Sequence, residues 1–223
     1  MIAVIDYGAG NLRNVCKSLE FVGAKIILTD QPDEIERADK VVLPGVGAFA
    51  HCLQGLQTRD LLEPLMDFAH GGKPFLGICV GMQLLFDAAE EMGEWPGLGL
   101  IPGRVVKFGF SKTEIRDWRL EIAGQPNLQS PISNLKIPHI GWNQVEGCQP
   151  CHAVLKDVPK AGYAYFVHSY HAQMPDSRHI VATTNYGYDF PSVVAKDNVW
   201  GIQFHPEKSQ DVGLQMLRNF VSL

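Results

Sequence analysis

A cysteine between two glycines is the first place where residue types and spacing in this chain could do chemistry. Cys79 follows the apolar run 75–78, with Gly77 two residues before it and Gly81 two residues after it. This spacing is typical of a nucleophile elbow, in which a buried strand turns sharply into a helix and presents its nucleophile. Backbone N–H groups at the start of the helix would favour the thiolate, the nucleophilic form of cysteine. A buried structural cysteine between two turn glycines is the alternative for this motif alone.

His205 and Glu207 offer a base and a group to orient it. They follow the apolar strand pattern 199–204, and Pro206 favours extended backbone at His205. Residues two apart in extended backbone point to the same side, so Glu207 can accept a hydrogen bond from one imidazole nitrogen. The other nitrogen would then face Cys79, as nucleophilic catalysis by a thiol requires. A surface turn with an exposed His and Glu is the alternative.

A glycine-rich loop could supply the remaining part of such a site. Pro44–Gly45–Val46–Gly47 follows the apolar run 40–43. Glycines at the end of a strand let the backbone expose free N–H groups, and these can stabilise an oxyanion without charged side chains. Ligands of parallel sheets collect at the carboxyl ends of the strands, so we expect this loop and Cys79 at the same edge. On its own the segment could equally be an ordinary loop.

The elements that must position these residues alternate between apolar strand runs and amphipathic helices. This pattern predicts an α/β fold with a mixed, mostly parallel central sheet flanked by helices, in a single domain over residues 1–223. We expect an insertion at about 111–136, where the sequence is polar and has no clean period. Helices are expected from Leu12, with Asn11 as N-cap, at about 58–69, from about 82 through 86, and after Ser209 as N-cap. Strands are expected at 2–5, 25–29, 40–43, 75–78, 104–108, 137–145, 164–170, 180–184, 192–195 and 199–204, with a loop at 93–103.

Composition excludes several classes of protein. Apolar residues make up 46% of the chain and charged residues 19%, as in globular proteins. The net charge of −5 and the lack of a basic tract argue against nucleic acid as the main partner. The first residues resemble neither a signal peptide nor a membrane span, so a cytoplasmic location and mostly reduced cysteines are expected.

No cofactor and no metal are expected from the motifs. Gly8–Ala9–Gly10 begins like a dinucleotide fingerprint, but Arg13 stands where the third glycine belongs. Cys148, Cys151 and His152 match the spacing of a haem attachment or a redox dithiol, although the second cysteine pair of a structural zinc site is missing. We interpret this spacing as a coincidence in a loop.

Six segments in order resemble the class I (triad) glutamine amidotransferases and, more closely, the family of glutaminase subunits of imidazole glycerol phosphate synthase. That enzyme belongs to histidine biosynthesis, and the resemblance runs nearly end to end. It also implies a flavodoxin-like core. The segments are 6–11 (DYGAGN), 44–49 (PGVGAF), 81–86 (GMQLLF), 138–143 (PHIGWN), 165–170 (YFVHSY) and 203–209 (QFHPEKS).

The resemblance implies a reaction and a set of roles. Cys79 would attack the side-chain amide of glutamine to form a γ-glutamyl thioester, with His205 moving the proton and Glu207 orienting it. Backbone N–H groups of Val46, Gly47 and Val80 would form the oxyanion hole. The glutamine pocket would be lined by Gly47, Gln83, Ser169 and Tyr170.

The resemblance also implies a partner, a (β/α)₈-barrel cyclase subunit that receives ammonia and makes imidazole glycerol phosphate and AICAR. The chain would face it, in a heterodimer, with Asn11, Asn14, Trp142, Tyr165 and Lys208. For each of these, an ordinary polar or aromatic surface is the alternative.

Other functions stay open at this point. A paralogous glutaminase could supply ammonia to another synthase, such as a sugar amidotransferase, and the insertion is longer than the family leads us to expect. A cysteine peptidase could use Cys79 and His205 but would need an extended cleft. Chaperone- or peptidase-like relatives of the fold often carry His directly after the elbow cysteine, where Val80 stands here. A non-catalytic binding module would have no use for the triad.

Overall fold

A nine-stranded mixed sheet organises the part of the chain that the computed structural model describes, residues 1–109, 135–148 and 152–223. Its strand order is β2-β1-β3-β4-β13-β12-β11-β8-β9. The strands from β2 to β13 pair in parallel and those from β13 to β9 pair antiparallel. The bounds are β1 Ile2–Ile5, β2 Ile26–Thr29, β3 Lys40–Gly45, β4 Phe75–Cys79, β8 His139–Gly147, β9 Gly162–His168, β11 Ile180–Asn185, β12 Asp189–Lys196 and β13 Val199–Ile202.

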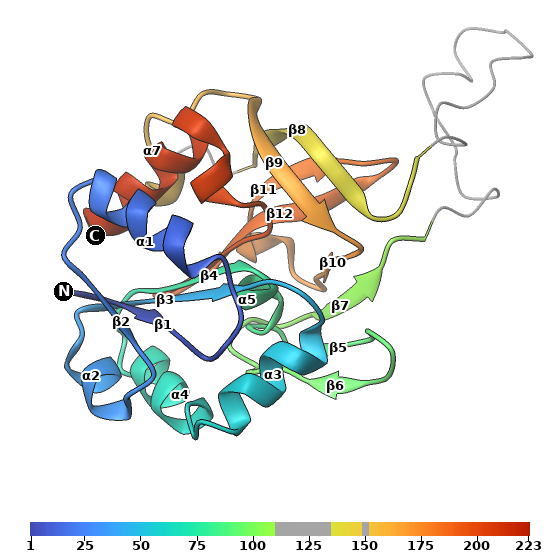
Figure 1. The fold of residues 1–223 in the computed structure, drawn as a ribbon. Helices are drawn as coiled ribbons and strands as arrows, with labels where there is room; N and C mark the ends of the chain where they lie inside the picture. The colour runs from blue at the N-terminus through green and yellow to red at the C-terminus, as the bar shows by residue number, and fades with distance from the viewer. Residues whose placement is uncertain (110–134, 149–151) are drawn as a thin grey trace, which may run out of the picture.

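Helices cover both faces of the parallel half of the sheet. Figure 1 shows α1 (Leu12–Phe21) and α7 (Gln210–Val221) on one face, and α2 (Pro32–Arg37), α3 (Phe49–Gln57) and α4 (Leu62–His70) on the other. The strands β1, β4 and β13 are buried along their whole length, which is why their sequences are continuous apolar runs. The short elements are α5 (Val80–Gln83), η2 (Ala153–Leu155), η3 (Ser177–His179) and η4 (Pro206–Lys208).

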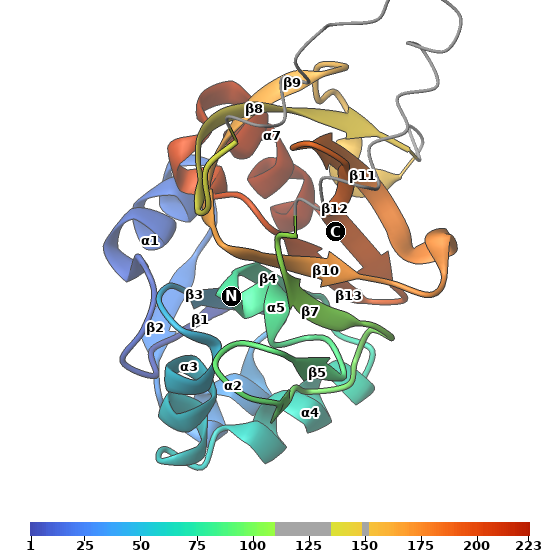
Figure 2. The same cartoon turned by 90° about the vertical axis from the view of Figure 1, so that its right-hand side faces the viewer.

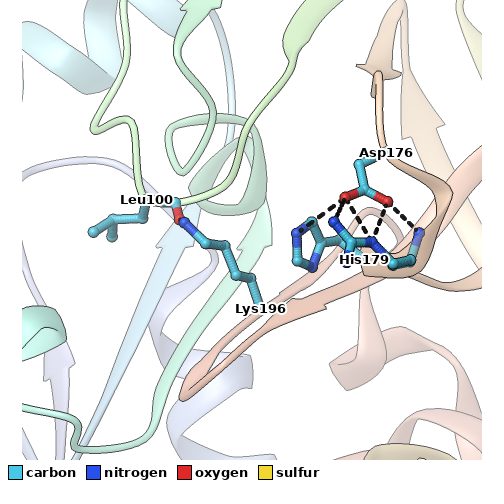
Figure 3. A network of polar contacts seen from close by, with 5 residues as sticks. Leu100, Asp176, His179 and Lys196 are labelled. Atoms are coloured by element: carbon cyan, nitrogen blue, oxygen red, sulfur yellow. Dashed lines mark hydrogen bonds and ion pairs between the residues drawn. The ribbon is translucent and has the colours of Figure 1, made fainter.

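A second, four-stranded sheet lies beside the first and includes part of the segment predicted as a loop (Figure 2). Its order is β10-β7-β5-β6, with bounds β5 Ala88–Ala89, β6 Trp95–Pro96, β7 Arg104–Lys107 and β10 Tyr170–Gln173. Lys196 at the end of β12 donates a hydrogen bond to the carbonyl of Leu100 at 3.1 Å (Figure 3) and so joins the large sheet to the segment between β6 and β7. The same figure shows the carboxylate of Asp176, which accepts a hydrogen bond from the amide of Arg178 in the turn before β11 and lies near the ring of His179.

Two predicted helices have different bounds. The helix expected at about 58–69 begins only at Leu62, as α4. Asp60 adopts φ +54 in a local turn, in which the amide of Leu61 bonds to the carbonyl of Leu56, and this turn ends α3, a helix that was not predicted. The helix expected through residue 86 ends at Gln83. The carbonyls of residues 84–86, which would continue it, accept hydrogen bonds from the amides of residues 98–101.

Two predicted N-cap residues stand at the expected positions but do not make the expected capping hydrogen bonds. Asn11 and Ser209 precede α1 and α7, but neither side chain bonds to the helix. Ser209 Oγ donates to the carbonyl of His205 at 2.6 Å and accepts from the amide of Tyr165 at 2.9 Å. The serine therefore joins β9 to the segment that carries His205.

The predicted insertion at about 111–136 falls almost entirely outside the described residues, as do residues 149–151. Within residues 1–109, 135–148 and 152–223, no helix combines the length and the apolar character needed to cross a membrane.

Candidate active site

Cys79 lies at a strained strand-to-helix turn, as the glycine spacing predicts. Its backbone has φ +56, it ends β4, and its side chain is buried, with the residue only 3% exposed. A Cβ on Gly81 would lie 1.8 Å from the carbonyl oxygen of Leu43, and one on Gly77 would lie 2.5 Å from that of Gly81. Both neighbours must therefore be glycine for the turn to pack against β3. Strain of this kind persists only where the surrounding structure enforces it.

Three adjacent strands bring the predicted site together. In the sheet, β4 pairs in parallel with β3 on one side and with β13 on the other, and Gly45 stands opposite Cys79. Val46 and Gly47 follow β3, Cys79 ends β4, and His205 follows β13. Their carboxyl ends meet at one edge of the sheet, where ligands of parallel sheets collect.

His205 and Glu207 form the expected pair, although the backbone reason differs from the prediction. Nδ1 of His205 lies 2.9 Å from Oε1 of Glu207. His205 is extended, but Glu207 lies in the 3-10 turn η4, which folds its carboxylate back to the ring. The same oxygen accepts a hydrogen bond from Nδ2 of Asn11 at 3.0 Å. The amide of His205 donates to the carbonyl of Tyr165 at 3.0 Å, which fixes the ring's backbone to β9.

The electrostatics of the pair favour a charged imidazolium. Burial lowers the pKa of His205, but the Cys79 sulfur and the Glu207 carboxylate outweigh burial and raise that pKa to about 10. Burial raises the pKa of Glu207, but hydrogen bonds from His205 and Asn11 outweigh it and lower the pKa below its usual range. Nε2 of His205 is buried and has no hydrogen-bond partner among the described residues. It is the nitrogen available to a thiol or a substrate.

Two buried side chains hold the carbonyls of the glycine loop on the side of α3. The hydroxyl of Tyr7 donates to the carbonyl of Pro44 at 2.6 Å, and the thiol of Cys52 donates to that of Val46 at 3.5 Å. Burial raises the pKa of both groups, to about 11 for Cys52, so both keep their protons and act as donors. Gly47 then adopts φ +94, a conformation that favours glycine.

A cavity of about 300 Å³ opens beside Cys79. Every residue predicted for the oxyanion hole and the glutamine pocket contributes to its wall, together with Cys79 and His205. Their roles remain predictions. The lining residues are Val46, Gly47, Cys79, Val80, Gln83, Glu91, Pro138, Val167, His168, Ser169, Tyr170 and His205.

Among the residues of this region that were not predicted, His168 and Gln203 make hydrogen bonds next to the cavity. His168 is buried and lines the cavity. Gln203 is fully buried, accepts from Nε2 of Gln83 at 3.1 Å, and places its own Nε2 4.0 Å from the sulfur of Cys79. Both lie inside the motifs 165–170 and 203–209, but only three-dimensional proximity shows their contacts.

Of the residues predicted to face a partner, Trp142, Tyr165 and Lys208 lie next to one another, whereas Asn11 contacts Glu207 and Asn14 is exposed on α1. The ring of Trp142 lies 6.1 Å from that of Tyr165, and Nζ of Lys208 lies 5.6 Å from the centroid of the Tyr165 ring. We name the outer side of β8 and β9 the docking face and define it by its side chains: Ile140, Trp142, Tyr163, Tyr165 and Val167.

Within the described ranges, no group of three or more His, Cys, Asp and Glu side chains could hold a metal ion. Cys148 is a free thiol, and His152 accepts a hydrogen bond from the amide of Val154 at 3.3 Å at the start of η2. Cys151 lies outside the described residues.

The chain is similar to solved glutamine amidotransferases in fold. One, described as a crystal structure of glutamine amidotransferase, has a TM-score of 0.71 at 14% identity and covers 100% of both chains. PurLQS from Thermotoga maritima has a TM-score of 0.68 at 15% identity, covering 99% of this chain and 96% of that one. At these identities the likeness shows the fold alone.

Relatives found by sequence are more similar to this chain than these solved structures are. The protein named imidazole glycerol phosphate synthase subunit HisH from Salinibacter ruber is 47% identical over 223 residues, which are 100% of this chain and 94% of the relative. Those of Desulfitobacterium hafniense and Syntrophotalea carbinolica are each 44% identical over 99% of this chain and 93% and 98% of their own lengths. Residues 3–223 match the family Glutamine amidotransferase class-I. The chain therefore belongs to the class-I glutamine amidotransferases, among the HisH subunits of imidazole glycerol phosphate synthase.

Proposed function

We propose that this chain hydrolyses the side-chain amide of glutamine through a thioester on Cys79. The sulfur attacks the amide carbon, and the oxyanion is stabilised by backbone N–H groups of Gly47 and Val80, with that of Val46 beside them. His205 gives its proton to the nitrogen, which leaves as ammonia while the γ-glutamyl thioester forms. His205 then takes a proton from water, which attacks the thioester, releases glutamate and regenerates the thiol.

The charge state of the pair suits the first step. With a pKa raised to about 10, His205 carries the required proton at neutral pH. Glu207 keeps the ring in one orientation through Nδ1, so that Nε2 points to the reacting atoms. Asn11 stabilises the charged carboxylate in turn.

The ammonia would pass to a separate (β/α)₈-barrel cyclase subunit, which makes imidazole glycerol phosphate and AICAR in histidine biosynthesis. The similar proteins from Salinibacter ruber, Desulfitobacterium hafniense and Syntrophotalea carbinolica are each named as a subunit of a synthase. The exposed docking face supports a partner on β8 and β9, because large apolar patches on a protein surface mark interaction sites. Asn11, Asn14 and Lys208 would contact the same partner.

The observation that carries the proposal is the convergence of Cys79, the His205–Glu207 pair and the loop at Gly47 on one cavity of about 300 Å³. That volume is at the small end of ligand pockets and suits one amino acid. It is not the extended cleft that a peptidase would need.

Cys79→Ala tests the proposal in the presence of the cyclase. Glutamine-dependent turnover should be lost, because no other group can form the thioester, whereas turnover with added ammonium should be unchanged. Cys148→Ala is the matched control, since its thiol is exposed and does not line the cavity. Residual glutamine hydrolysis by Cys79→Ala above the level of a blank would overturn the assignment.

A further inference from the structure

Two buried histidines connect strand β8 to the wall of the cavity. Nδ2 of Asn143 lies 3.2 Å from Nε2 of His139, and Nδ1 of His139 lies 3.1 Å from Nε2 of His168. Nδ1 of His168 lies 2.8 Å from the carbonyl oxygen of Tyr170. We call Asn143, His139 and His168 the histidine bridge. His139 and His168 stand opposite each other in the β8–β9 pair, and both are buried.

The contacts at each end of the histidine bridge independently fix which nitrogen atoms donate hydrogen and which accept it. The carbonyl of Tyr170 can only accept, so Nδ1 of His168 carries hydrogen and its Nε2 must accept. At the other end, Oδ1 of Asn143 accepts from the amide of Gln144 at 2.8 Å and Nδ2 donates to the carbonyl of Asn185 at 2.8 Å. The amide orientation is therefore set, and the second hydrogen of Nδ2 points to Nε2 of His139.

The contacts at both ends of the histidine bridge require the same protonation state of the two rings. His139 must carry its hydrogen on Nδ1 and donate it to His168, so each ring is neutral and protonated on Nδ1 alone. A second proton on either ring would place two donors face to face, at Nε2 of His139 or between the rings. Burial also lowers the pKa of His139 to about 4 and that of His168 to about 3.

The surroundings of the bridge are aromatic. Rings of Phe166, Tyr186, Phe108 and Phe190 pack against His139. The titratable neighbours are His171 on β10, whose ring is 5.7 Å from Phe190, and Tyr186 and Tyr188 in the turn between β11 and β12. His205 also lies near enough to lower the pKa of His168 slightly. A carboxylate that could stabilise a charged ring is absent from the described contacts of either histidine.

The bridge continues through the cavity wall to the nucleophile. The carbonyl of Tyr170 also accepts from Nε2 of Gln83 at 3.0 Å, and the same nitrogen donates to Oε1 of Gln203 at 3.1 Å. Nε2 of Gln203 faces the sulfur of Cys79 at 4.0 Å. One carbonyl, that of Tyr170, therefore joins the histidine bridge to the two glutamine side chains beside the thiol.

We propose that the histidine bridge is a positioning device, which fixes the Tyr170 carbonyl and through it Gln83 in the geometry that binds glutamine. His139 and His168 are thus positioning residues rather than catalytic ones. Their effect on kinetics rests on the proposed glutaminase function, whereas the direction of the bridge can be measured without it.

The direction is tested on the free full-length chain by ¹⁵N NMR of labelled histidine side chains, with His139→Leu and His168→Leu for assignment. Between pH 6 and 8, both rings should show a protonated Nδ1 and an unprotonated Nε2, and neither should titrate. A hydrogen on Nε2 of either ring, or titration of either near pH 6.5, would overturn the inference.

The positioning role is tested by steady-state glutaminase kinetics. His168→Leu should raise KM for glutamine about tenfold, with a smaller change in kcat, because it removes the donor that holds the Tyr170 carbonyl. His168→Asn should recover part of the loss, since its amide can still donate there. The double variant His139→Leu/His168→Leu should raise KM for glutamine no more than the more damaging of the two single substitutions, because both residues act through one chain of hydrogen bonds.

His171→Leu is the matched control. His171 is equally buried, 6% exposed like His168, in the same aromatic cluster, but its nitrogens contact the Ala172 carbonyl and the Tyr188 hydroxyl. It should leave KM unchanged. An equal rise in KM for His171→Leu, or additive effects of His139→Leu and His168→Leu, would overturn the positioning role. Failure of the proposed function would look different, as a wild-type chain that hydrolyses no glutamine even with the cyclase present.

Discussion

At the scale of single residues, the contact between Asn11 and Glu207 joins positions 196 residues apart in the chain. Asn11→Ala removes the one side-chain donor besides His205 that the structure shows on this carboxylate. We expect kcat/KM of the isolated chain for glutamine to fall about tenfold, the usual size for a hydrogen bond to a charged group. Asn14→Ala, exposed on the same helix, is the control and should behave as wild type. Equal rates for Asn11→Ala and wild type would contradict this role.

Glu207→Gln should lower kcat by roughly 10²–10⁴, because the amide can present the wrong group to the ring. It should also move the alkaline limb of the pH profile of kcat/KM to lower pH. The carboxylate helps to raise the pKa of His205 to about 10, so without it the imidazolium loses its proton at a lower pH. Glu63→Gln on the exposed side of α4 is the control. An alkaline limb that stays in place would refute the electrostatic role of Glu207.

The same raised pKa links His205 to stability. A group with a higher pKa in the folded than in the unfolded chain stabilises the folded state. That stabilisation is complete at pH values below the pKa in the unfolded chain, which is about 6.5 for histidine. That contribution is lost as pH rises towards about 10. Glu207→Gln should therefore weaken the pH dependence of unfolding across this window.

The sequence could predict the residues whose signal is local. Cys79 with its glycines, and His205 with Glu207, are recognisable because spacing of a few residues carries the chemistry. Gln203 and His168 have no such signal, since each matters through a partner that is distant in sequence. Asn11 shows the opposite case, because its local pattern predicts a helix cap but its side chain contacts the site instead.

At the scale of elements, the elbow depends on how closely α5 approaches β3. Gly81→Ala would place a Cβ 1.8 Å from the backbone oxygen of Leu43, and backbone cannot move aside cheaply. We expect a loss of about 3 kcal/mol or more in the free energy of unfolding, measured with denaturant. Gly109→Ala is the control, because a Cβ there meets no atom of the described residues within 4 Å. Similar denaturant concentrations at the midpoint of unfolding for Gly81→Ala and Gly109→Ala would contradict the packing argument.

Element type was predictable along most of the chain, and element ends were not. Apolar runs identify strands such as β1, β4 and β13, because burial on both faces requires them. The end of α5 at Gln83 depends on hydrogen bonds from residues 98–101, which no local pattern reveals. The break at Asp60 is local in origin, because Asp adopts the left-handed conformation more readily than most residues and the amide of Leu61 bonds back to the carbonyl of Leu56, but the sequence pattern did not reveal it.

At the scale of the whole molecule, the docking face lies on the strands that carry the histidine bridge and meet His205. Trp142→Ala should weaken cyclase-stimulated glutaminase activity, raising the cyclase concentration for half-maximal stimulation by roughly tenfold or more, as for a central aromatic anchor. Basal activity should not change. Trp95→Ala on β6 is the control, since Trp95 is 37% exposed but lies on the other sheet. Unaltered stimulation of Trp142→Ala would place the partner elsewhere.

Alternate side chains of β8 lie on opposite faces of the sheet and serve two different roles. Ile140 and Trp142 point outward, while His139 and Asn143 point inward to the buried rings. Deleting a single residue from this strand would exchange the two sets, so that an indole faced the interior and imidazoles faced water. Point substitutions can impair association or substrate affinity separately, but a one-residue deletion in β8 should impair both at once.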